Sequence, residues 1–238
     1  MKPVLLLVPG VLCNATVWER VAEALRSEAD IRVSLPLEDS IAAMAESAWA
    51  TVADVPAEVP LVLAGFSLGG FVALDMLARP VRAIQAAALI STSGRPESPE
   101  GAIARGKTIA ALGRDFPRAV EGILQFASPG ASGSLAADLR RMMHEVGPDT
   151  GIRQNRAAQA REDHRAALPG LRLPVAVLCG TQDRVTPPDR SRELADLIPG
   201  ARLELFEGAG HMLPREQPDF VARALRALLP AQEPGMTQ

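Results

Sequence analysis

The sequence predicts an α/β protein with a mostly parallel sheet of about six strands and helices on both faces. Strand-like and helix-like segments alternate from the first residues, which is typical of parallel sheets covered on both sides. One stretch, from Arg95 to about Leu168, interrupts this alternation with helical patterns and no convincing strand. Because it is too long for an ordinary connection, we expect an inserted helical unit.

The composition narrows the class of protein further. The 238 residues are 47% hydrophobic and 22% charged, which suits a globular domain with a sizeable core. The net charge of −3 argues against nucleic acid or an acidic membrane as partner. No apolar run approaches the ~20 residues that cross a bilayer, and the N-terminus lacks the order of a signal peptide. Cys13 and Cys179 are not spaced like the ligands of a metal site or like a disulfide framework, so we expect both to be free thiols. We also expect a cytoplasmic location and no metal or other cofactor.

Six apolar runs bounded by turn-forming residues are predicted as strands. In chain order they are Val4–Val8, Ile31–Leu35, Leu61–Gly65, Ala86–Ser91, Val175–Cys179 and Leu203–Phe206. The helices predicted between them are Asn14–Glu28, Ser40–Val52, Leu68–Ala78, Asp189–Ile198 and Asp219–Leu228. Asn14 and Ser40 stand where N-caps belong.

Four more helices are predicted inside the interrupting stretch: Glu100–Gly113, Pro117–Ala127, Ser134–Glu145 and Thr150–Arg161. We therefore expect residues 1–94 and 169–230 to form the α/β core and residues 95–168 to form a helical cap over the functional edge of the sheet. The tail 231–238 has little to bury and is predicted to be disordered.

Ser67 is the candidate nucleophile. It lies between Gly65 and Gly69, where a predicted strand passes into a predicted helix, and this is the nucleophile elbow pattern. The tight turn strains the serine backbone and needs neighbours without bulk. Such a turn holds Ser67 Oγ above the sheet and aims the first free N–H groups of the helix at whatever the serine attacks.

A serine hydroxyl needs a base, and the sequence offers three histidines. His144 and His164 lie among charged residues of the helical stretch and are predicted on a solvated helix face. His211 lies in a glycine-bordered loop after a predicted strand, and loops at the carboxyl ends of strands line the ligand crevice of an open α/β sheet. His211 is therefore the predicted base.

Asp183 is the predicted carboxylate partner of the histidine. It follows the strand Val175–Cys179, so it too lies on a strand-end loop. Asp189 is instead predicted as a helix N-cap, and Glu162 and Asp163 are assigned to the last helix of the cap. The chain order Ser67, Asp183, His211 is the order expected for an elbow of this type.

Acyl transfer also requires donors for an oxyanion. The Leu68 N–H at the helix start is one candidate, and the Val11 N–H after the first strand is the other, with Leu12 one residue away. Residues that flank these positions are predicted to line a pocket: Leu12, Phe66, Val185 and Met212. The cap offers Phe116, Phe126, Met142 and Met143, each of which can equally pack within the cap, while Arg153 and Arg156 are predicted as solvated surface.

At these residues the chain resembles the small, capped serine α/β-hydrolases, which include pimeloyl-acyl-carrier-protein methyl ester esterases and enol-lactonases. The likeness is carried by Pro9-Gly10-Val11 with Trp18 downstream, Gly65 to Gly70, Asp183 to Pro187, and Gly210-His211 with Glu216 and Pro218. Relatives usually have His-Gly where this chain has Pro9-Gly10. Many also begin with an antiparallel hairpin that is missing here, so we expect six strands and not eight.

The sequence therefore predicts a metal-independent hydrolase of a small carboxylic ester or lactone that works through an acyl-enzyme. The substrate is expected to be a small ester, a lactone or an acyl group on a carrier. A thioesterase, a carbon–carbon bond hydrolase or a lyase would use the same residues, and a slow-turnover binding or sensor protein is the alternative from a different class. Aspartate-nucleophile dehalogenases and epoxide hydrolases are disfavoured because the elbow residue is Ser67.

Overall fold

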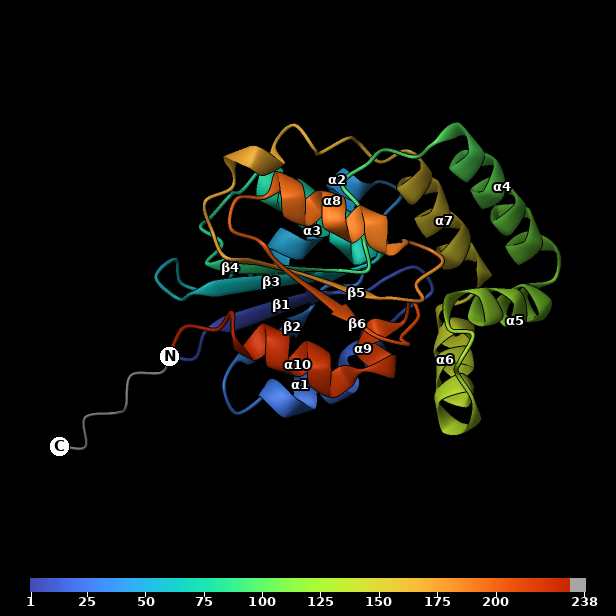
Figure 1. Cartoon of the computed structure of the whole chain (residues 1–238), viewed down its shortest axis with the longest axis horizontal. Coiled ribbons are helices and arrows are strands. Elements are labelled where there is room, and N and C mark those ends of the chain that lie inside the picture. The colour runs from blue at the N-terminus through green and yellow to red at the C-terminus, as the bar shows by residue number, and fades with distance from the viewer. Residues whose placement is uncertain (232–238) are drawn as a thin grey trace.

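The computed structural model describes residues 1–231 and has a six-stranded sheet at its centre (Figure 1). The strands are β1 (Val4–Val8), β2 (Asp30–Val33), β3 (Leu61–Phe66), β4 (Ala86–Ile90), β5 (Val175–Gly180) and β6 (Arg202–Phe206). Their order across the sheet is β2-β1-β3-β4-β5-β6, and every neighbouring pair is parallel. The prediction of a six-stranded parallel sheet is confirmed.

Burial explains why these runs form strands. Every residue of β1, β3, β4 and β5 is buried, whereas the edge strands β2 and β6 are partly exposed. Successive side chains point to opposite faces of a sheet, so Leu6 packs into one core and Leu5 and Leu7 into the other. A continuous apolar run is thus required wherever both faces are covered.

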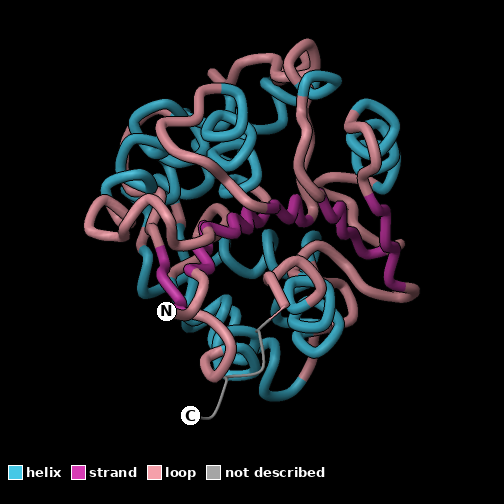
Figure 2. Tube along the Cα trace, turned by 90° about the vertical axis from the view of Figure 1, so that its left-hand side faces the viewer, coloured by secondary structure: helices cyan, strands magenta, loops and turns pink. Residues whose placement is uncertain are grey.

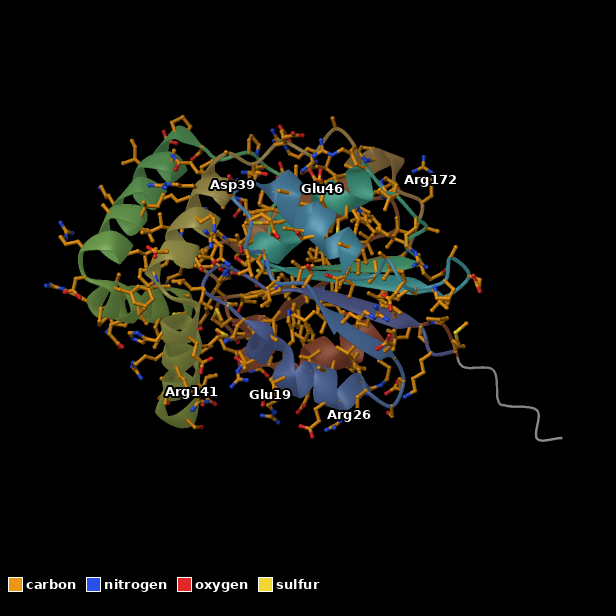
Figure 3. The ribbon with its side chains drawn as sticks, turned by 180° about the vertical axis from the view of Figure 1, so that it is seen from behind. Glu19, Arg26, Asp39, Glu46, Arg141 and Arg172 are labelled. Carbon is orange, nitrogen blue, oxygen red and sulfur yellow. The ribbon has the colours of Figure 1, made fainter. Side chains whose placement is uncertain are left out.

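Helices cover the two faces as separate layers (Figure 2). One face carries α2 (Ile41–Ala50), α3 (Leu68–Ala78) and α8 (Pro188–Leu197), and the other carries α1 (Glu19–Leu25), α9 (Leu213–Glu216) and α10 (Pro218–Arg226) (Figure 1). Each layer buries its apolar side chains against the sheet, and charged side chains such as Arg26, directly after α1, project outward (Figure 3).

A group of four helices lies between β4 and β5 in the chain and beyond the carboxyl ends of the strands (Figure 1). These are α4 (Pro99–Arg114), α5 (Phe116–Ala127), α6 (Gly133–Val146) and α7 (Pro148–Gln159). Residues 95–168, which contain them, are called the helical segment below. Leu112, Val120 and Met143 of this segment form a small cluster with Leu12 of the core, so the segment rests directly on the loop after β1.

Local capping agrees with the sequence at two helix starts. Asn14 caps a short 3-10 helix, Ala15–Trp18, by accepting the Thr16 N–H, and Ser40 caps α2 by accepting the Ala43 N–H. The helix predicted over Asn14–Glu28 is therefore divided between this 3-10 turn and α1. The short helix α9 was not predicted.

Two boundary predictions are wrong. Asp189 does not cap α8, because the helix begins earlier, at Pro188, and places Asp189 inside its first turn. Helix α7 ends at Gln159, so Glu162, Asp163 and His164 lie in the segment that returns to the core. The predicted disordered tail falls, apart from Ala231, outside the described residues. Within residues 1–231 no helix has the length and apolar character needed to span a membrane.

Candidate active site

Ser67 occupies the turn between β3 and α3 with φ 54° and ψ −112°. A positive φ is unusual for a residue with a Cβ and costs of order 1–3 kcal/mol unless the surroundings hold it. Hydrogen bonds do so here: the Ser67 N–H donates to Ile90 O at 2.9 Å, and the Thr92 hydroxyl donates to Ser67 O at 2.9 Å. The end of β4 thus fixes the elbow from the side.

Glycines make this turn sterically feasible. A Cβ on Gly65 would run into the backbone of Gly69, and a Cβ on Gly69 would run into the backbone of Val8. Gly70 faces the Thr92 side chain in the same way. The Gly-x-Ser-x-Gly-Gly pattern is thus a requirement of close packing between β1, β3, α3 and the end of β4.

Asp183 lies on the loop after β5, as predicted, and is 3% exposed. Its Oδ1 accepts the backbone N–H groups of Val185 and Thr186, both at 2.9 Å. Its Oδ2 accepts the Thr186 hydroxyl at 3.0 Å. These bonds orient the carboxylate so that Oδ2 faces His211.

His211 lies on the loop between β6 and α9, and a single carboxylate organises that loop. Glu216 accepts the N–H groups of Gly210 at 2.7 Å and Met212 at 3.0 Å, and it also accepts the Ser128 hydroxyl at 2.6 Å. The His211 N–H donates to Ala127 O, the last residue of α5, at 2.7 Å. The histidine loop is therefore held from the helical segment as well as from the core.

The three predicted residues meet above the carboxyl ends of the strands. His211 Nε2 is 2.9 Å from Ser67 Oγ, and His211 Nδ1 is 2.8 Å from Asp183 Oδ2. Ser67 and His211 are 8% and 5% exposed, and the Phe66 ring lies 5.3 Å from the imidazole ring, centre to centre. A chain of hydrogen bonds from hydroxyl to imidazole to carboxylate can pass a proton from the serine to the histidine.

The electrostatics of the site favour an ionised Asp183. Burial alone raises the pKa of this carboxyl, but the attraction of His211 and the hydrogen bonds from His211 and Thr186 outweigh it and lower the pKa below its usual value. A carboxylate held ionised beside Nδ1 keeps the proton on that nitrogen, which leaves Nε2 free to accept one from Ser67.

Backbone donors lie beside the serine. Leu68 begins α3, so its N–H has no partner within the helix. Gly10 lies so close to the elbow that an added Cβ would come within 3.1 Å of Ser67 Cβ, and Val11, the next residue, lines the same cavity as Ser67. The Leu12 N–H is engaged elsewhere, by Gln154 Oε1 at 2.9 Å. Within residues 1–231 the Val11 N–H meets no acceptor, so it is the better of the two candidates.

A cavity of about 1540 Å³ lies between Ser67 and the helical segment. The four predicted residues of the core line it, Leu12, Phe66, Val185 and Met212, and so do two of the four candidates from the helical segment, Phe126 and Met143. Met142 packs into the core cluster instead, and the prediction that Phe116 lines the cavity is wrong. The Phe116 ring packs edge-on against His144 at 5.2 Å and against the cluster around Leu112, because it lies at the start of α5 with its side chain turned into the segment.

The remaining candidates from the sequence take structural roles. His144 is exposed, as predicted, but His164 is buried, because its segment folds back onto the core. The His164 N–H donates to Gly94 O, and its Nε2 lies 3.7 Å from Asp75 Oδ1. Burial raises the pKa of both Cys13 and Cys179 to about 12, which keeps their thiols protonated and unreactive.

Two residues at the site were not singled out by the sequence. Thr186 touches both Asp183 and His211, with 3.4 Å between its hydroxyl and His211 Nδ1. Gln154 reaches the loop after β1 from α7. Thr186 was near enough to Asp183 in sequence to be considered, whereas nothing in the sequence links Gln154 to a loop 142 residues away.

Known proteins share sequence with this chain over most of its length. The chain is 31% identical over 246 residues to the pimeloyl-[acyl-carrier protein] methyl ester esterase of Chromobacterium violaceum, covering 97% of this chain and 95% of that protein. It is 29% identical over 206 residues to the protein of the same name from Neisseria meningitidis serogroup A. That match covers 82% of this chain, which spans 62% of the length of the Neisseria relative.

A solved structure gives the same fold. The enol-lactonase from Burkholderia xenovorans LB400 superposes with a TM-score of 0.83 at 21% identity, covering 96% of this chain and 91% of that one. Residues 5–224 match the family described as "Alpha/beta hydrolase family", which includes both halves of the core and the helical segment between them. The chain therefore belongs to the alpha/beta hydrolase family.

Proposed function

We propose that this hydrolase cleaves a small carboxylic ester or lactone through an acyl-enzyme on Ser67. The observation that carries the proposal is the continuous hydrogen-bonded path from Ser67 Oγ through His211 to Asp183, with lengths of 2.9 and 2.8 Å. The esterase names of the two sequence relatives support the choice of bond.

In the first half of the reaction, Ser67 Oγ attacks the carbonyl carbon while His211 Nε2 takes the hydroxyl proton. The negative charge that develops on the carbonyl oxygen is stabilised by the N–H groups of Val11 and Leu68. His211 then gives its proton to the departing alkoxide, and an acyl group remains on Ser67. Asp183 stays ionised throughout and stabilises the imidazolium.

In the second half, water enters where the alcohol left. His211 takes a proton from this water, the hydroxide attacks the acyl carbon, and the same two N–H groups stabilise the second oxyanion. Collapse returns the proton to Ser67 Oγ and releases the carboxylic acid. The elbow makes this cycle feasible because Ser67 and His211 both line the cavity, while Asp183 is buried behind His211.

We assign the helical segment, residues 95–168, the role of a cap that selects the substrate. It supplies most of the cavity wall that faces Ser67, and its helices α4 and α5 contribute both apolar and charged lining residues. An acyl group on a carrier, as in the names of the sequence relatives, is one substrate of the proposed class. The cytoplasmic location stays a prediction.

The proposal is tested with a short aryl ester, p-nitrophenyl butyrate, and an active-serine phosphonate. We expect the wild-type protein to release p-nitrophenol and to be labelled once, at Ser67. Ser67→Ala should lose both activities. Ser93→Ala is the matched control, because Ser93 lines the same cavity without contacting His211.

If Ser67→Ala retains full hydrolysis, Ser67 is not the nucleophile. If the wild-type protein hydrolyses none of a panel of esters and lactones, the proposed class of enzyme is wrong. Thioesters and carbon–carbon substrates offered in competition separate the alternative hydrolases. Thermal stabilisation by a ligand without any product would favour the binding protein.

A further inference from the structure

The loop between β1 and the short 3-10 helix is held from the helical segment and not only from the core. Gln154 of α7 is fully buried and makes two hydrogen bonds: its Oε1 accepts the Leu12 N–H at 2.9 Å, and its Nε2 donates to Pro36 O at 3.0 Å. The Leu12 side chain packs against the same helix, at a site where Gly151 leaves room for it. One side chain of α7 therefore joins two loops of the core.

The loop needs this support because of its backbone conformation. The Cys13 N–H donates to Gly10 O at 3.2 Å, so Gly10 to Cys13 form a tight turn. Leu12 is the third residue of that turn and has φ 55°, a value that such a position normally reserves for glycine or asparagine. A leucine remains there only where its surroundings fix it, and Gln154 provides a polar partner for its peptide group.

The turn from Gly10 to Cys13 sets the direction of the Val11 N–H. The carbonyl of the Gly10–Val11 peptide is committed to Cys13, so the N–H of the same peptide points the opposite way. Gly10 is also the residue that stands against Ser67 and Phe66. Gln154 holds the N–H of the central Val11–Leu12 peptide, and this peptide shares Val11 with the Gly10–Val11 peptide, so loss of that bond frees the backbone on both sides of Val11 and with it the direction of the Val11 N–H.

We infer that Gln154 is a positioning residue for the oxyanion hole: it fixes the Leu12 peptide from α7 and thereby holds the Val11 N–H toward the oxyanion. The inference rests on the proposed function. It makes the helical segment part of the catalytic apparatus, because displacement of α7 would move a transition-state donor without touching Ser67 or His211. Gln154 does not contact the substrate and contributes through Leu12 alone.

The test compares Gln154→Met with Gln159→Met. Both replace glutamine by methionine on α7, but Gln159 makes no side-chain hydrogen bond within residues 1–231. For p-nitrophenyl butyrate, we expect Gln154→Met to lower kcat by about 10–100-fold, since loss of an entire oxyanion donor costs about 10²–10³-fold. KM should change by less than about twofold, because the donor acts on the transition state. The affinity for butylboronic acid, which mimics the tetrahedral intermediate, should fall by the same factor as kcat.

Gln154→Asn covers the case in which Gln154→Met does not fold. It keeps an amide but ends one methylene short of Leu12, and it should show the same separation of kcat from KM. Equal kcat values for the folded Gln154 variants and Gln159→Met would overturn the inference while leaving the proposed function intact. A raised KM at unchanged kcat would also overturn it. A wild-type protein that hydrolyses no ester would remove the proposed function and this inference together.

Discussion

The residues next to them in the sequence were enough to predict that Ser67, Asp183 and His211 act together, and the structure brings the three side chains into contact. Each has its signal nearby: two glycines around the serine, a strand end before the aspartate, and a glycine-bordered loop around the histidine. Gln154 carries no such signal, because its role depends on which loops the fold brings together, and the contact of Thr186 with His211 likewise appears only in the fold. His164 was misassigned for the same reason, since its burial depends on the return of its segment to the core.

Asp183→Asn tests the proposed role of the Asp183 carboxylate with the smallest change in side-chain shape. An asparagine can donate to Nδ1, which favours the imidazole tautomer with its proton on Nε2, and that tautomer cannot accept the serine proton. We expect kcat to fall by about 10³–10⁴-fold with p-nitrophenyl butyrate, as for the equivalent change in serine proteases. Asp189→Asn is the control, because Asp189 lies on α8, makes no contact with His211 and pairs only loosely, at 3.8 and 3.6 Å, with the partly exposed Arg95 and Arg190. Equal kcat values for the two variants would argue against the role of Asp183.

At the scale of elements, α3 was predicted with its observed bounds, because a glycine-rich turn starts it and no breaker interrupts it before Pro80. The helices of the segment were also found, to within three residues, from their Gly and Pro boundaries. The faces of the helical segment that line the cavity were harder to predict. Phe116 and Phe126 belong to one helix and look equivalent in sequence, yet only Phe126 lines the cavity.

Two glycine-to-alanine substitutions should change the free energy of unfolding in opposite directions, one through close packing and the other through helix propensity. Gly69→Ala should destabilise the protein by several kcal/mol or prevent folding, because its Cβ meets the Val8 backbone, which cannot move without shifting β1. Gly106→Ala, on the exposed face of α4 with nothing within 4 Å, should stabilise by about 0.5–1 kcal/mol. Urea unfolding of the wild type and both variants measures the change in the free energy of unfolding. A tolerated Gly69→Ala would show that the elbow is less tightly packed than described.

Glu97 ties the start of the helical segment to its end. Its carboxylate accepts Arg105 Nε at 2.6 Å and Arg161 Nη1 at 3.0 Å, and all three side chains are largely buried. Burial raises the pKa of Glu97, but the hydrogen bonds and charges of the two arginines outweigh it and hold the pKa below its usual 4.5. A lowered folded-state pKa means stability that is fully present above pH 4.5 and is lost as the pH falls through the folded value.

We therefore expect Glu97→Gln to lower the free energy of unfolding by about 1–3 kcal/mol at pH 7, the usual value of hydrogen bonds to charged groups. The difference from the wild type should shrink steadily below pH 4.5. Thermal unfolding between pH 3 and pH 7 measures it. Glu46→Gln, on the exposed face of α2, should show no such dependence (Figure 3). A difference that persists undiminished at low pH would mean that the Glu97 carboxylate charge contributes nothing.

At the scale of the whole molecule, the sheet order and the helical segment leave a cavity of about 1540 Å³ above Ser67. Its size could not be predicted from the sequence, because it depends on how far the four helices lie from the sheet. An acyl chain that enters this cavity is transferred from water to a site with apolar lining residues. Burial of one methylene contributes about 0.8 kcal/mol, so kcat/KM for p-nitrophenyl esters should rise about fourfold per added carbon beyond acetate.

The series from acetate to octanoate measures this rise. A profile that is flat, or that falls from acetate onward, would show that acyl chains do not occupy the cavity. Phe126→Ala offers a second check, since Phe126 lines the cavity wall and is 53% exposed without substrate. Phe126→Ala should reduce the rise in kcat/KM per added carbon more than it reduces kcat/KM for the acetate ester.

The order of the strands also determines when this chain becomes active. The elbow follows β3, near the middle of the sheet, whereas His211 follows β6, which is the last strand in the chain and lies at the sheet edge. Ser67 and His211 are 144 residues apart. On the ribosome, the serine therefore emerges long before its base, and β6 cannot join the sheet until β5 has been made and placed. If Ser67 and His211 act as proposed, the growing chain carries an inert serine until β6, the last strand of residues 1–231, is in place.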